Sequence, residues 1–483
     1  MMVKEEFARI HQKNLQVIRH YLDAGDYSCA MRIVAMQANM AYQYNQFYFD
    51  EELENLWQEI LTKLPCCQEK PEIYTGRVLW YDAFGLGNRG LAYIYLHALD
   101  ALGYEILYIT YDGVQNTLSR IRDIVEKDKH KLVFLSRGDV LEQYQQLSKL
   151  ITEWGGMANF LYTTPNDVAG IAAFQNLPAN FKRYQVNLTD HAYWLGTNAF
   201  DICIEFRAFG AYISHVLRQI PKEKLKMLPY YPTVNRKAKF KGFPFEKKLG
   251  QKVMFSGGSI YKTRDQAGTF YQIVAELLTA NDNLLFWYAG NKKIAEFAVL
   301  EKKFAGRVFF TAERDDLYQV LEQVDVYLNT YPISGALMLQ YAALAGKVPF
   351  TLVHDADAYG LLLQEKGVYY RQQADMVANI NRYLQDDAYC KELEKAMAKA
   401  VITPENFISN LQKLITDNIT EYDIAWQKFD VDSFQKTYLE CWNKKSCYRN
   451  IVIQKNINVY GHYVKEITAW ICMTAMDIIC RRK

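Results

Sequence analysis

One stretch identifies the fold class of this chain: Asp325-Val-Tyr-Leu-Asn329-Thr330-Tyr-Pro332-Ile-Ser334-Gly335, followed by Ala336-Leu-Met-Leu-Gln-Tyr-Ala-Ala-Leu-Ala345-Gly346-Lys-Val-Pro349. It predicts a buried strand, a tight Ser-Gly turn, an apolar helix, a glycine stop and a second strand. Such a turn leaves backbone N–H groups at the positive end of the helix dipole, where phosphate binds. In an α/β chain of this length, we expect that phosphate to belong to a nucleotide or a nucleotide-sugar. An ordinary strand–helix–strand unit with a glycine-containing turn is the alternative.

The composition is that of a globular protein and excludes several classes. The chain has 483 residues, of which 50% are apolar and 23% charged, and its length suggests two to four structural units. Its 56 Lys and Arg nearly balance its 54 Asp and Glu, so no basic excess is present to hold nucleic acid. The 36 tyrosines mildly favour a carbohydrate or nucleotide ligand, because their rings can stack on sugars and bases.

The cysteines and the chain ends indicate a cytoplasmic protein. Nine cysteines are irregularly placed and show no metal-ligand spacing, which favours reduced thiols. The first residues lack the apolar core of a signal peptide, and no apolar run is long enough to span a membrane. The segment 463–483 ends in Arg481-Arg482-Lys483. We expect it to be a helix that docks on the protein, with peripheral membrane contact as the alternative.

The pattern along the chain predicts two α/β lobes between helical ends. Strands alternate with helices in two blocks, as in parallel sheets with helical crossovers. The expected units are a helical N-terminal extension (1–70), an N-terminal Rossmann-like acceptor lobe (71–235), a C-terminal Rossmann-like donor lobe (236–430) and C-terminal helices (431–483). The proline- and lysine-rich run 229–250 is the expected interdomain linker. Two such lobes place a ligand cleft between the carboxyl ends of their strands.

A cationic segment follows the first strand of the second lobe. It reads Ser256-Gly-Gly-Ser-Ile-Tyr261-Lys262-Thr-Arg264-Asp265, at the position where small residues let a ligand approach the backbone. Lys262 is a compact positive charge suited to a diphosphate leaving group, with Arg264 as a second candidate. Both could instead be solvated loop cations.

Residues 252–353 resemble the donor lobe of the protein O-linked N-acetylglucosamine transferases, which belong to the GT-B glycosyltransferases. Tyr261-Lys262, with Leu285-Phe-Trp287 further on, is similar to a family unit in which the lysine holds the donor diphosphate. Arg314, in Thr311-Ala-Glu-Arg, stands where the family places a basic residue against the nucleobase. The run from Asp325 to Gly335 is similar to the family's phosphate turn. The resemblance therefore implies donor contacts from Tyr261, Lys262, Arg314, Ser334, Gly335, Ala336 and Leu337.

The chain departs from this family pattern beside the turn. Ala336, Leu337 and Met338 replace a histidine and threonines, so side-chain contacts are lost while backbone amides remain. Tyr341 stands where the family has a ribose-binding aspartate, and Leu317 where it has a stacking histidine. These changes affect the identity of the nucleotide more than the phosphate site. Gln340 and Tyr341 replace the glutamate of many retaining enzymes, which favours inversion.

Two features of the first lobe face the expected cleft. The turn Gly85-Leu-Gly87-Asn88-Arg89-Gly90 follows the first strand and suits an acceptor, although a structural turn explains it equally well. The run Asn187-Leu-Thr-Asp190-His191 begins at the end of an expected strand. His191 could remove the proton of an acceptor hydroxyl, oriented by Asp190 or by Glu205. A hydrogen-bonded structural histidine is the alternative.

These features predict an inverting glycosyltransferase that needs no metal ion or other cofactor. It would move a hexose or an N-acetylhexosamine from a nucleoside-diphosphate sugar, with UDP expected, to a hydroxyl of a protein or glycan. No Asp-x-Asp stands at a strand end apart from Asp355 and Asp357, which we interpret as a helix cap. A catalytically silent GT-B subunit that binds a glycan or a partner enzyme is the second hypothesis, and an epimerase the third. Homo- or hetero-oligomeric assembly is left open.

Overall fold

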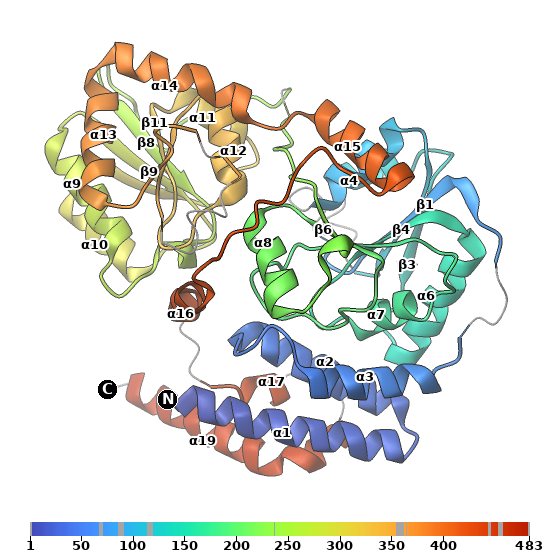
Figure 1. Cartoon of the computed structure of the whole chain (residues 1–483). Coiled ribbons are helices and arrows are strands. Elements are labelled where there is room, and N and C mark those ends of the chain that lie inside the picture. Colours follow the sequence, from blue (N-terminus) through green and yellow to red (C-terminus); the bar gives the residue numbers. More distant parts are fainter. Residues whose placement is uncertain are drawn as a thin grey trace.

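The chain forms two α/β lobes that lie side by side, and a layer of helices lies beneath the first of them (Figure 1). The computed structural model describes residues 2–66, 71–85, 91–113, 119–235, 237–353, 362–363, 365–442, 446–452 and 457–481. Both lobes contain a parallel sheet covered by helices, which confirms the expected pair of Rossmann-like lobes with helical segments at both ends.

The first lobe contains a parallel sheet in the order β3-β2-β1-β4-β5-β6-β7. The strand β1 lies between β2 and β4, and its residues 78–81 are fully buried because helices cover both faces of the sheet. The strands are β1 (Tyr74–Asp82), β2 (Glu105–Tyr111), β3 (Lys131–Leu135), β4 (Gly156–Tyr162), β5 (Arg183–Val186), β6 (Ile202–Glu205) and β7 (Leu225–Met227). The helices are α4 (Leu91–Ala101), α5 (Ser119–Val125), α6 (Val140–Trp154), α7 (Val168–Gln175) and α8 (Ala208–Tyr212), followed by a π-helix (Ile213–Leu217) and a 3₁₀ turn (Lys222–Lys224).

The second lobe repeats this arrangement with the order β10-β9-β8-β11-β12-β13. The stretch around Gly335 forms β11, α12 and β12, as its pattern predicts. The strands are β8 (Lys252–Gly257), β9 (Leu284–Ala289), β10 (Val308–Thr311), β11 (Val326–Leu328), β12 (Pro349–Leu352) and β13 (Tyr369–Tyr370). The helices are the 3₁₀ helix η4 (Ile260–Thr263), α9 (Thr269–Ala280), α10 (Ala295–Lys303), α11 (Leu317–Gln323), α12 (Ala336–Leu344), α13 (Gln373–Gln385) and α14 (Asp387–Ala400).

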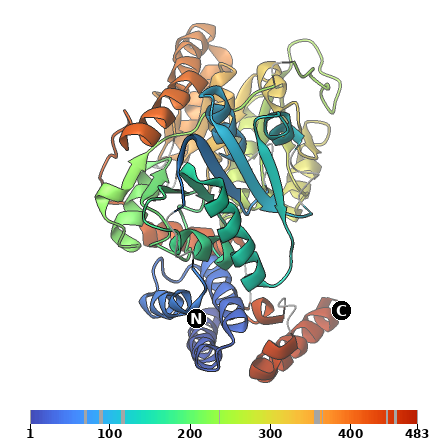
Figure 2. The same cartoon turned by 90° about the vertical axis from the view of Figure 1, so that its right-hand side faces the viewer.

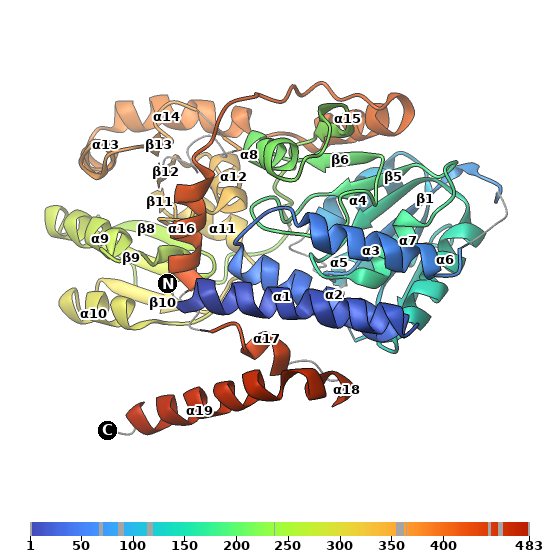
Figure 3. The ribbon, with the colours of Figure 1, turned by 60° about the horizontal axis from the view of Figure 1, so that its bottom comes forward.

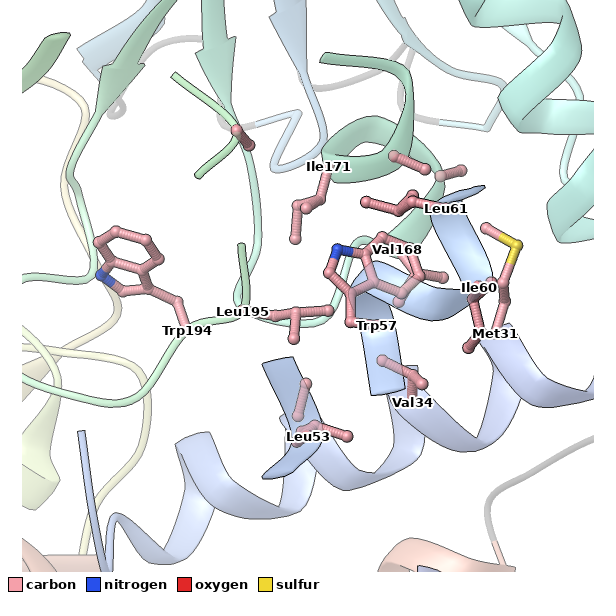
Figure 4. Close-up of a cluster of buried hydrophobic side chains, with 14 of the residues drawn as sticks. Met31, Val34, Leu53, Trp57, Ile60, Leu61, Val168, Ile171, Trp194 and Leu195 are labelled. Atoms are coloured by element: carbon pink, nitrogen blue, oxygen red, sulfur yellow. The ribbon is translucent and has the colours of Figure 1, made fainter. Parts of the chain in front are cut away.

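The N-terminal extension packs on the first lobe. It consists of α1 (Met2–Asp23), α2 (Tyr27–Tyr44) and α3 (Glu51–Lys63), and it shares a hydrophobic core with α6 and α7. Figure 4 shows Trp57 of α3 beside Val168 and Leu195 of the first lobe. The indole nitrogen of Trp57 also donates to Gln175 Oε1 at 3.2 Å. The extension is therefore part of the body of the first lobe.

The chain returns across both lobes after α14. The helix α15 (Pro404–Asp417) lies within the range expected for the second lobe but packs on α4, where Phe407 meets Tyr95 edge to face at 5.1 Å. An irregular arm then leads to α16 (Val431–Trp442), which lies between the lobes in Figures 1 and 3. The last helices are α17 (Arg449–Val452), α18 (Ile457–Tyr460), the 3₁₀ turn η5 (Gly461–Tyr463) and α19 (Val464–Arg481). Figures 2 and 3 show α19 as the outermost helix of the basal layer.

The helix α19 is anchored to the protein at its first turn. Glu466, whose side chain is 2% exposed, forms ion pairs with Arg9 at 3.2 Å and with Lys13 at 2.9 Å on α1. Just before the helix, Tyr463 donates to Asn14 Oδ1 at 2.6 Å. The expectation of a docking helix is therefore confirmed for this end of the segment. In the described part of the chain, no helix has the length and hydropathy required to cross a bilayer.

Candidate active site

A cavity of about 300 Å³ lies between the two lobes. Its walls come from α4 and the segments after β5, β6 and β7 in the first lobe, from the segments after β8 and β11 in the second lobe, and from α16. The strands β5, β6 and β7 are neighbours in one sheet and β8 and β11 in the other, so their carboxyl ends bring these segments together. The polar and charged residues that line it include Asp190, His191, Arg207, Tyr261, Lys262, Ser334 and Tyr341.

The first-lobe wall is built on a buried ion pair. Arg207 Nε donates to Asp190 Oδ2 at 2.5 Å, and its terminal nitrogen donates to Oδ1 at 2.9 Å. Burial raises the pKa of Asp190, but the charge of Arg207 and the hydrogen bonds from His191 and Arg207 outweigh it and hold the pKa well below its usual range. Gly210 lets α8 approach this pair closely, because a Cβ there would lie 2.8 Å from Asp190 Cβ.

His191 contacts the same carboxylate, as one of the two sequence hypotheses predicts. Its Nδ1 lies 3.3 Å from Asp190 Oδ1. An ionised carboxylate only accepts hydrogen bonds, so Nδ1 carries a proton and Nε2 is the nitrogen that can take one up. The other hypothetical partner, Glu205, is fully buried and instead accepts from Asn187 at 2.9 Å and from Ser214 at 2.5 Å. Burial raises the pKa of Glu205, and the hydrogen bonds from Ser214 and Asn187 offset this rise only in part.

The N-terminal extension holds the His191 loop from outside the lobe. Asn45 Nδ2 and Tyr48 Oη donate to the carbonyl oxygen of His191 at 3.2 and 3.3 Å. Asn45 Oδ1 accepts from the Tyr193 amide at 3.0 Å, and Glu54 accepts from the Gly196 amide at 2.8 Å. These contacts were not predicted, because Asn45 and Tyr48 stand far from His191 in the sequence.

The helix α16 completes the wall beside His191. Phe434 and Tyr438 line the cavity and belong to an aromatic cluster with Tyr48 and Phe209. On the other side, Cys441 Sγ donates to the Arg264 carbonyl at 3.0 Å. The helix therefore bridges the two lobes at the cavity. Arg264, the second candidate for a phosphate contact, is not among the residues that line the cavity, and its Nε lies 3.9 Å from Glu296 Oε1.

The second-lobe wall brings together the residues that follow β8 and β11. Tyr261 and Lys262 lie on η4, and burial raises the pKa of Tyr261 to about 12. Ser334, Ala336 and Leu337 line the cavity at the start of α12, a helix that begins without a side-chain cap. The structure therefore brings these five residues of the predicted donor site to one cavity.

Gly335 is part of the hydrogen-bonded turn that precedes α12. Asn329 Oδ1 accepts from the Thr330 amide at 2.9 Å and from the Gly335 amide at 3.0 Å. A Cβ at Gly335 would lie 3.2 Å from the same oxygen, so a side chain there would press on the turn. The expected ligand contact through the Gly335 amide is corrected here, because that N–H already has an acceptor. The amides of Ala336 and Leu337 follow it at the first positions of the helix.

Arg314 does not line the cavity. It forms a bidentate ion pair with Asp316, at 2.6 Å for both bonds, and donates to the Gly242 carbonyl at 3.2 Å. Its guanidinium lies over Trp287, 5.2 Å from the ring centroid. Asp316 also accepts from the Lys241 amide at 2.7 Å. The expectation that Arg314 faces a nucleobase is thus corrected: its donors hold the interlobe linker on the second lobe.

The three expected acceptor residues, Gly87, Asn88 and Arg89, lie outside the described residues. Their neighbours on both sides are described. Asp82, at the end of β1, accepts from the Phe84 and Gly85 amides at 2.8 Å, and Leu91, at the start of α4, lines the cavity. Asp355 and Asp357 also lie outside the described part of the chain. In that part, no group of three His, Cys, Asp or Glu residues is placed to hold a metal ion.

Comparison with known proteins finds similarity in structure and none in sequence. No family model and no curated protein matches the sequence. A glycosyltransferase from Rickettsia africae has a similar structure, with a TM-score of 0.54 at 10% identity over 71% of this chain and 100% of that chain. A mutant O-GlcNAc transferase from Thermobaculum terrenum aligns with a TM-score of 0.49 at 13% identity, over 89% of this chain and 84% of that chain. The likeness to the first protein shows the fold, and the chain has the GT-B architecture that the sequence resemblance implies.

Proposed function

We propose that this chain is a glycosyltransferase that moves a hexose or an N-acetylhexosamine from a nucleoside-diphosphate sugar, with UDP expected, to an acceptor hydroxyl. One observation carries the proposal. Asp190 and His191 of the first lobe line the same cavity as Lys262 and the uncapped start of α12 in the second lobe. This pairs a proton acceptor with an anion site across an interlobe cleft. The GT-B fold shared with the Rickettsia africae glycosyltransferase supports the same reading.

The first lobe supplies the base. Nε2 of His191 takes the proton of the acceptor hydroxyl while the oxygen attacks the anomeric carbon. Asp190 holds Nδ1–H and stabilises the imidazolium that forms, and Arg207 keeps that carboxylate ionised. Attack from the side opposite the diphosphate inverts the anomeric configuration. The acceptor is a hydroxyl of a protein or of a glycan.

The second lobe stabilises the leaving group. As the bond from the anomeric carbon to the diphosphate oxygen breaks, negative charge grows on the diphosphate. The ammonium of Lys262, the hydroxyl of Ser334 and the amides of Ala336 and Leu337 surround the place where that charge develops. These groups take the role that a metal ion has in other transferases, so we propose transfer without a metal.

The direct test uses the purified chain with UDP-, GDP-, CMP- and dTDP-sugars. A nucleotide-sugar that binds should add ~2.7 kcal/mol of stability in a thermal-shift assay when its free concentration is one hundred times its dissociation constant. Release of the nucleotide, followed with and without acceptor, then reports hydrolysis or transfer, and the anomer is read by NMR. Stabilisation by no nucleotide-sugar would refute the proposal. A 2-epimerised sugar without acceptor would indicate the epimerase hypothesis instead.

The second candidate is a catalytically silent subunit that binds a glycan or a partner transferase. Two observations favour it. The side chains of Ala336 and Leu337 at the phosphate turn are apolar, and the cavity of about 300 Å³ is at the lower end of the roughly 300–1,000 Å³ usual for ligand sites. Nucleotide-sugar binding without hydrolysis or transfer, with any acceptor and with added EDTA or Mg²⁺, would support this candidate.

A further inference from the structure

A second cavity, of about 810 Å³, lies beside α16 and shares no lining residue with the candidate active site. We call it the side groove. Its size is within the roughly 300–1,000 Å³ usual for ligand sites. Three distant parts of the chain line it: the segment between α2 and α3 (46–49), the turns that follow α8, and the arm that leads into α16 (428–432).

Aromatic rings form much of the side groove. Phe47, Phe49 and Tyr212 are half-buried, so part of each ring is open to solvent. Tyr212 meets the buried ring of Phe429 edge to face, with centroids 5.5 Å apart. Phe47 meets Tyr193 in the same way, also at 5.5 Å. These contacts hold the rings in place, and such ring faces can stack on the apolar C–H face of a sugar.

Polar side chains stand among these rings. They are three carboxamides (Gln46, Gln219, Gln435), two carboxylates (Asp430, Asp432) and one ammonium (Lys428). A sugar hydroxyl both donates and accepts, which carboxamides can match on both sides, and carboxylates accept from it. The acids outnumber the cation, so the groove does not suit a phosphate or an acidic chain. Asp430 also caps α16, where its Oδ1 accepts from the Ser433 amide at 3.1 Å.

Gln219 is held in a backbone conformation that favours glycine. Its φ is 60°, and it follows the π-helix that ends at Leu217, another residue of the groove wall. The other two non-glycine residues with positive φ in the described part of the chain are asparagines, which tolerate this region better. π-Helices are frequent at functional sites. An exposed glutamine kept in this conformation at a groove indicates that its side chain is used.

The side groove is joined to the loop that carries the candidate base. Arg218, which is buried beside Gln219, donates to the carbonyl oxygens of Thr189 and Asp190, both at 3.1 Å. Tyr48, another groove residue, donates to the His191 carbonyl at 3.3 Å. A ligand in the groove therefore contacts residues that are bonded to this loop or adjacent to those that are.

The helix α16 also connects the two cavities. Val431 and Gln435 line the side groove, and Phe434 and Tyr438 line the candidate active site. At 3.6 residues per turn, these two pairs occupy adjacent faces of the helix. Val431, Phe434 and Tyr438 belong to one hydrophobic cluster with Tyr48, so the two cavities share a wall.

We propose that the side groove binds a neutral oligosaccharide, as the part of a glycan acceptor that extends beyond the candidate active site. The inference rests on the proposed function, because it names the acceptor of that reaction. It selects a glycan over a peptide. All the lining residues lie in helices or irregular segments, so an extended peptide would find no strand edge for its backbone. A sugar requires only the rings and the polar groups that are present.

The first test measures binding without any nucleotide-sugar. The full chain is applied to an array of neutral and acidic oligosaccharides and to a set of peptides that contain Ser and Thr. We expect neutral oligosaccharides to be retained, and calorimetry on one of them then gives its dissociation constant. Tyr212→Ala should weaken this binding by about tenfold through the lost ring contact. Thermal unfolding shows whether this variant, which also loses its packing on Phe429, stays folded.

Two further variants change exposed polar groups and have matched controls. Asp432→Asn, in the first turn of α16, should weaken binding by about tenfold, because hydroxyls lose a charged acceptor. Its control is Asp375→Asn, in the first turn of α13.

Gln219→Gly should weaken oligosaccharide binding by about threefold to tenfold, because a carboxamide is lost. Glycine adopts the same φ, so the protein should unfold at about the temperature of the unchanged chain. The control is Asn418→Gly, which makes the same kind of change at a φ of 58° at the end of α15. It should leave oligosaccharide binding unaltered.

The outcomes separate this inference from the proposed function. If both hold, Gln219→Gly raises the KM for a glycan acceptor and leaves kcat and the KM for the donor unchanged. Transfer to a peptide by a chain that retains no oligosaccharide would overturn the inference and keep the transferase. Oligosaccharide binding that the groove variants weaken, without any transfer, would support the binding site and refute the transferase. Equal affinity in the groove variants and their controls would overturn the inference.

Discussion

The imidazole ring of His191 meets the phenol ring of Tyr438 edge to face, with centroids 5.1 Å apart and ring planes at 61°. The histidine belongs to the first lobe, and the tyrosine to α16, which reaches the cavity from the C-terminal part of the chain. This contact limits how the imidazole can rotate, and the bonds from Asn45 and Tyr48 to the His191 carbonyl hold the backbone that carries the ring. Segments outside both α/β lobes thus shape the candidate base.

Replacing His191 by Ala should lower the turnover number for transfer by ~10²–10⁴-fold, because the acceptor hydroxyl loses its base. Donor affinity, measured by calorimetry, should change little, since the phosphate groups are held by the other lobe. Asp190→Asn should also lower turnover, because Nδ1 loses its charged partner. Full activity in the His191 variant would remove the general-base proposal.

Lys262→Ala should lower turnover by ~10²-fold or more if the ammonium stabilises the departing diphosphate. Lys262→Arg should retain part of the activity, because the charge stays while its shape changes. The matched control is Lys293→Ala, whose ammonium pairs with Glu301 on the surface at 2.6 Å. Unchanged sugar transfer in Lys262→Ala would exclude the role.

Tyr438→Leu should lower turnover by about tenfold through a misplaced imidazole, while the KM for the donor stays close to that of the unchanged chain. Trp426→Leu, in the exposed arm before α16, is the control. A loss confined to thermal stability would show that Tyr438 serves packing alone.

Arg314→Ala should destabilise the protein by about 2 kcal/mol or more, because the buried carboxylate of Asp316 loses a bidentate partner. The dissociation constant of the donor should be unaltered. Urea unfolding and calorimetry on the same preparation separate the two effects. If Arg314→Ala instead weakened donor binding and left the free energy of unfolding unchanged, the nucleobase contact implied by the family resemblance would be supported.

The buried carboxyl of Glu54 should make stability depend on pH. Burial raises its pKa from 4.5 to about 7, an effect that the backbone hydrogen bonds from Gly196 and Thr197 only partly offset. Below the ordinary pKa the Glu54 carboxyl is neutral in both the folded and the unfolded chain, and the folded protein keeps its full stability. As the pH rises, the unfolded chain ionises first, so this stability is lost by the time the pH has risen through about 7. The loss should approach roughly 3 kcal/mol above that pH.

Glu54→Gln isolates this contribution, because the amide oxygen can still accept from the Gly196 amide while no charge forms. The free energy of unfolding, measured in urea at pH 5 and at pH 8, should fall more for the unchanged chain than for this variant. Asp82, whose pKa burial raises to about 6, acts in the same direction in both proteins. Equal pH dependence in the two would contradict the assignment.

Local pattern was enough to find the α/β lobes and half of the cavity wall. The strand, turn and helix around Gly335 are set by short-range periodicity and turn chemistry. Parallel sheets then bring Tyr261, Lys262 and Ser334 to one edge, because β8 and β11 are neighbours. The proximity of Asp190 and His191 was predictable for the same reason, as they follow a strand of the first sheet.

Other members of the wall were not predictable from local pattern. Arg207 follows β6 as Asp190 follows β5, so its position after a neighbouring strand was the one available signal. Asn45, Tyr48 and Tyr438 carry no such signal, since they come from helices packed on the lobes from outside.

The amino-acid sequence thus specified which segments become strands and helices, and which cations and turn amides stand at strand ends, because these depend on neighbours within a few residues. The folded arrangement specified the partners. In the folded chain Arg207 forms an ion pair with Asp190, Arg314 forms one with Asp316 beside the linker, and Tyr438 of α16 packs on His191. Those contacts arise from packing between distant segments, where many pairings satisfy the same local pattern and the burial of whole surfaces selects one.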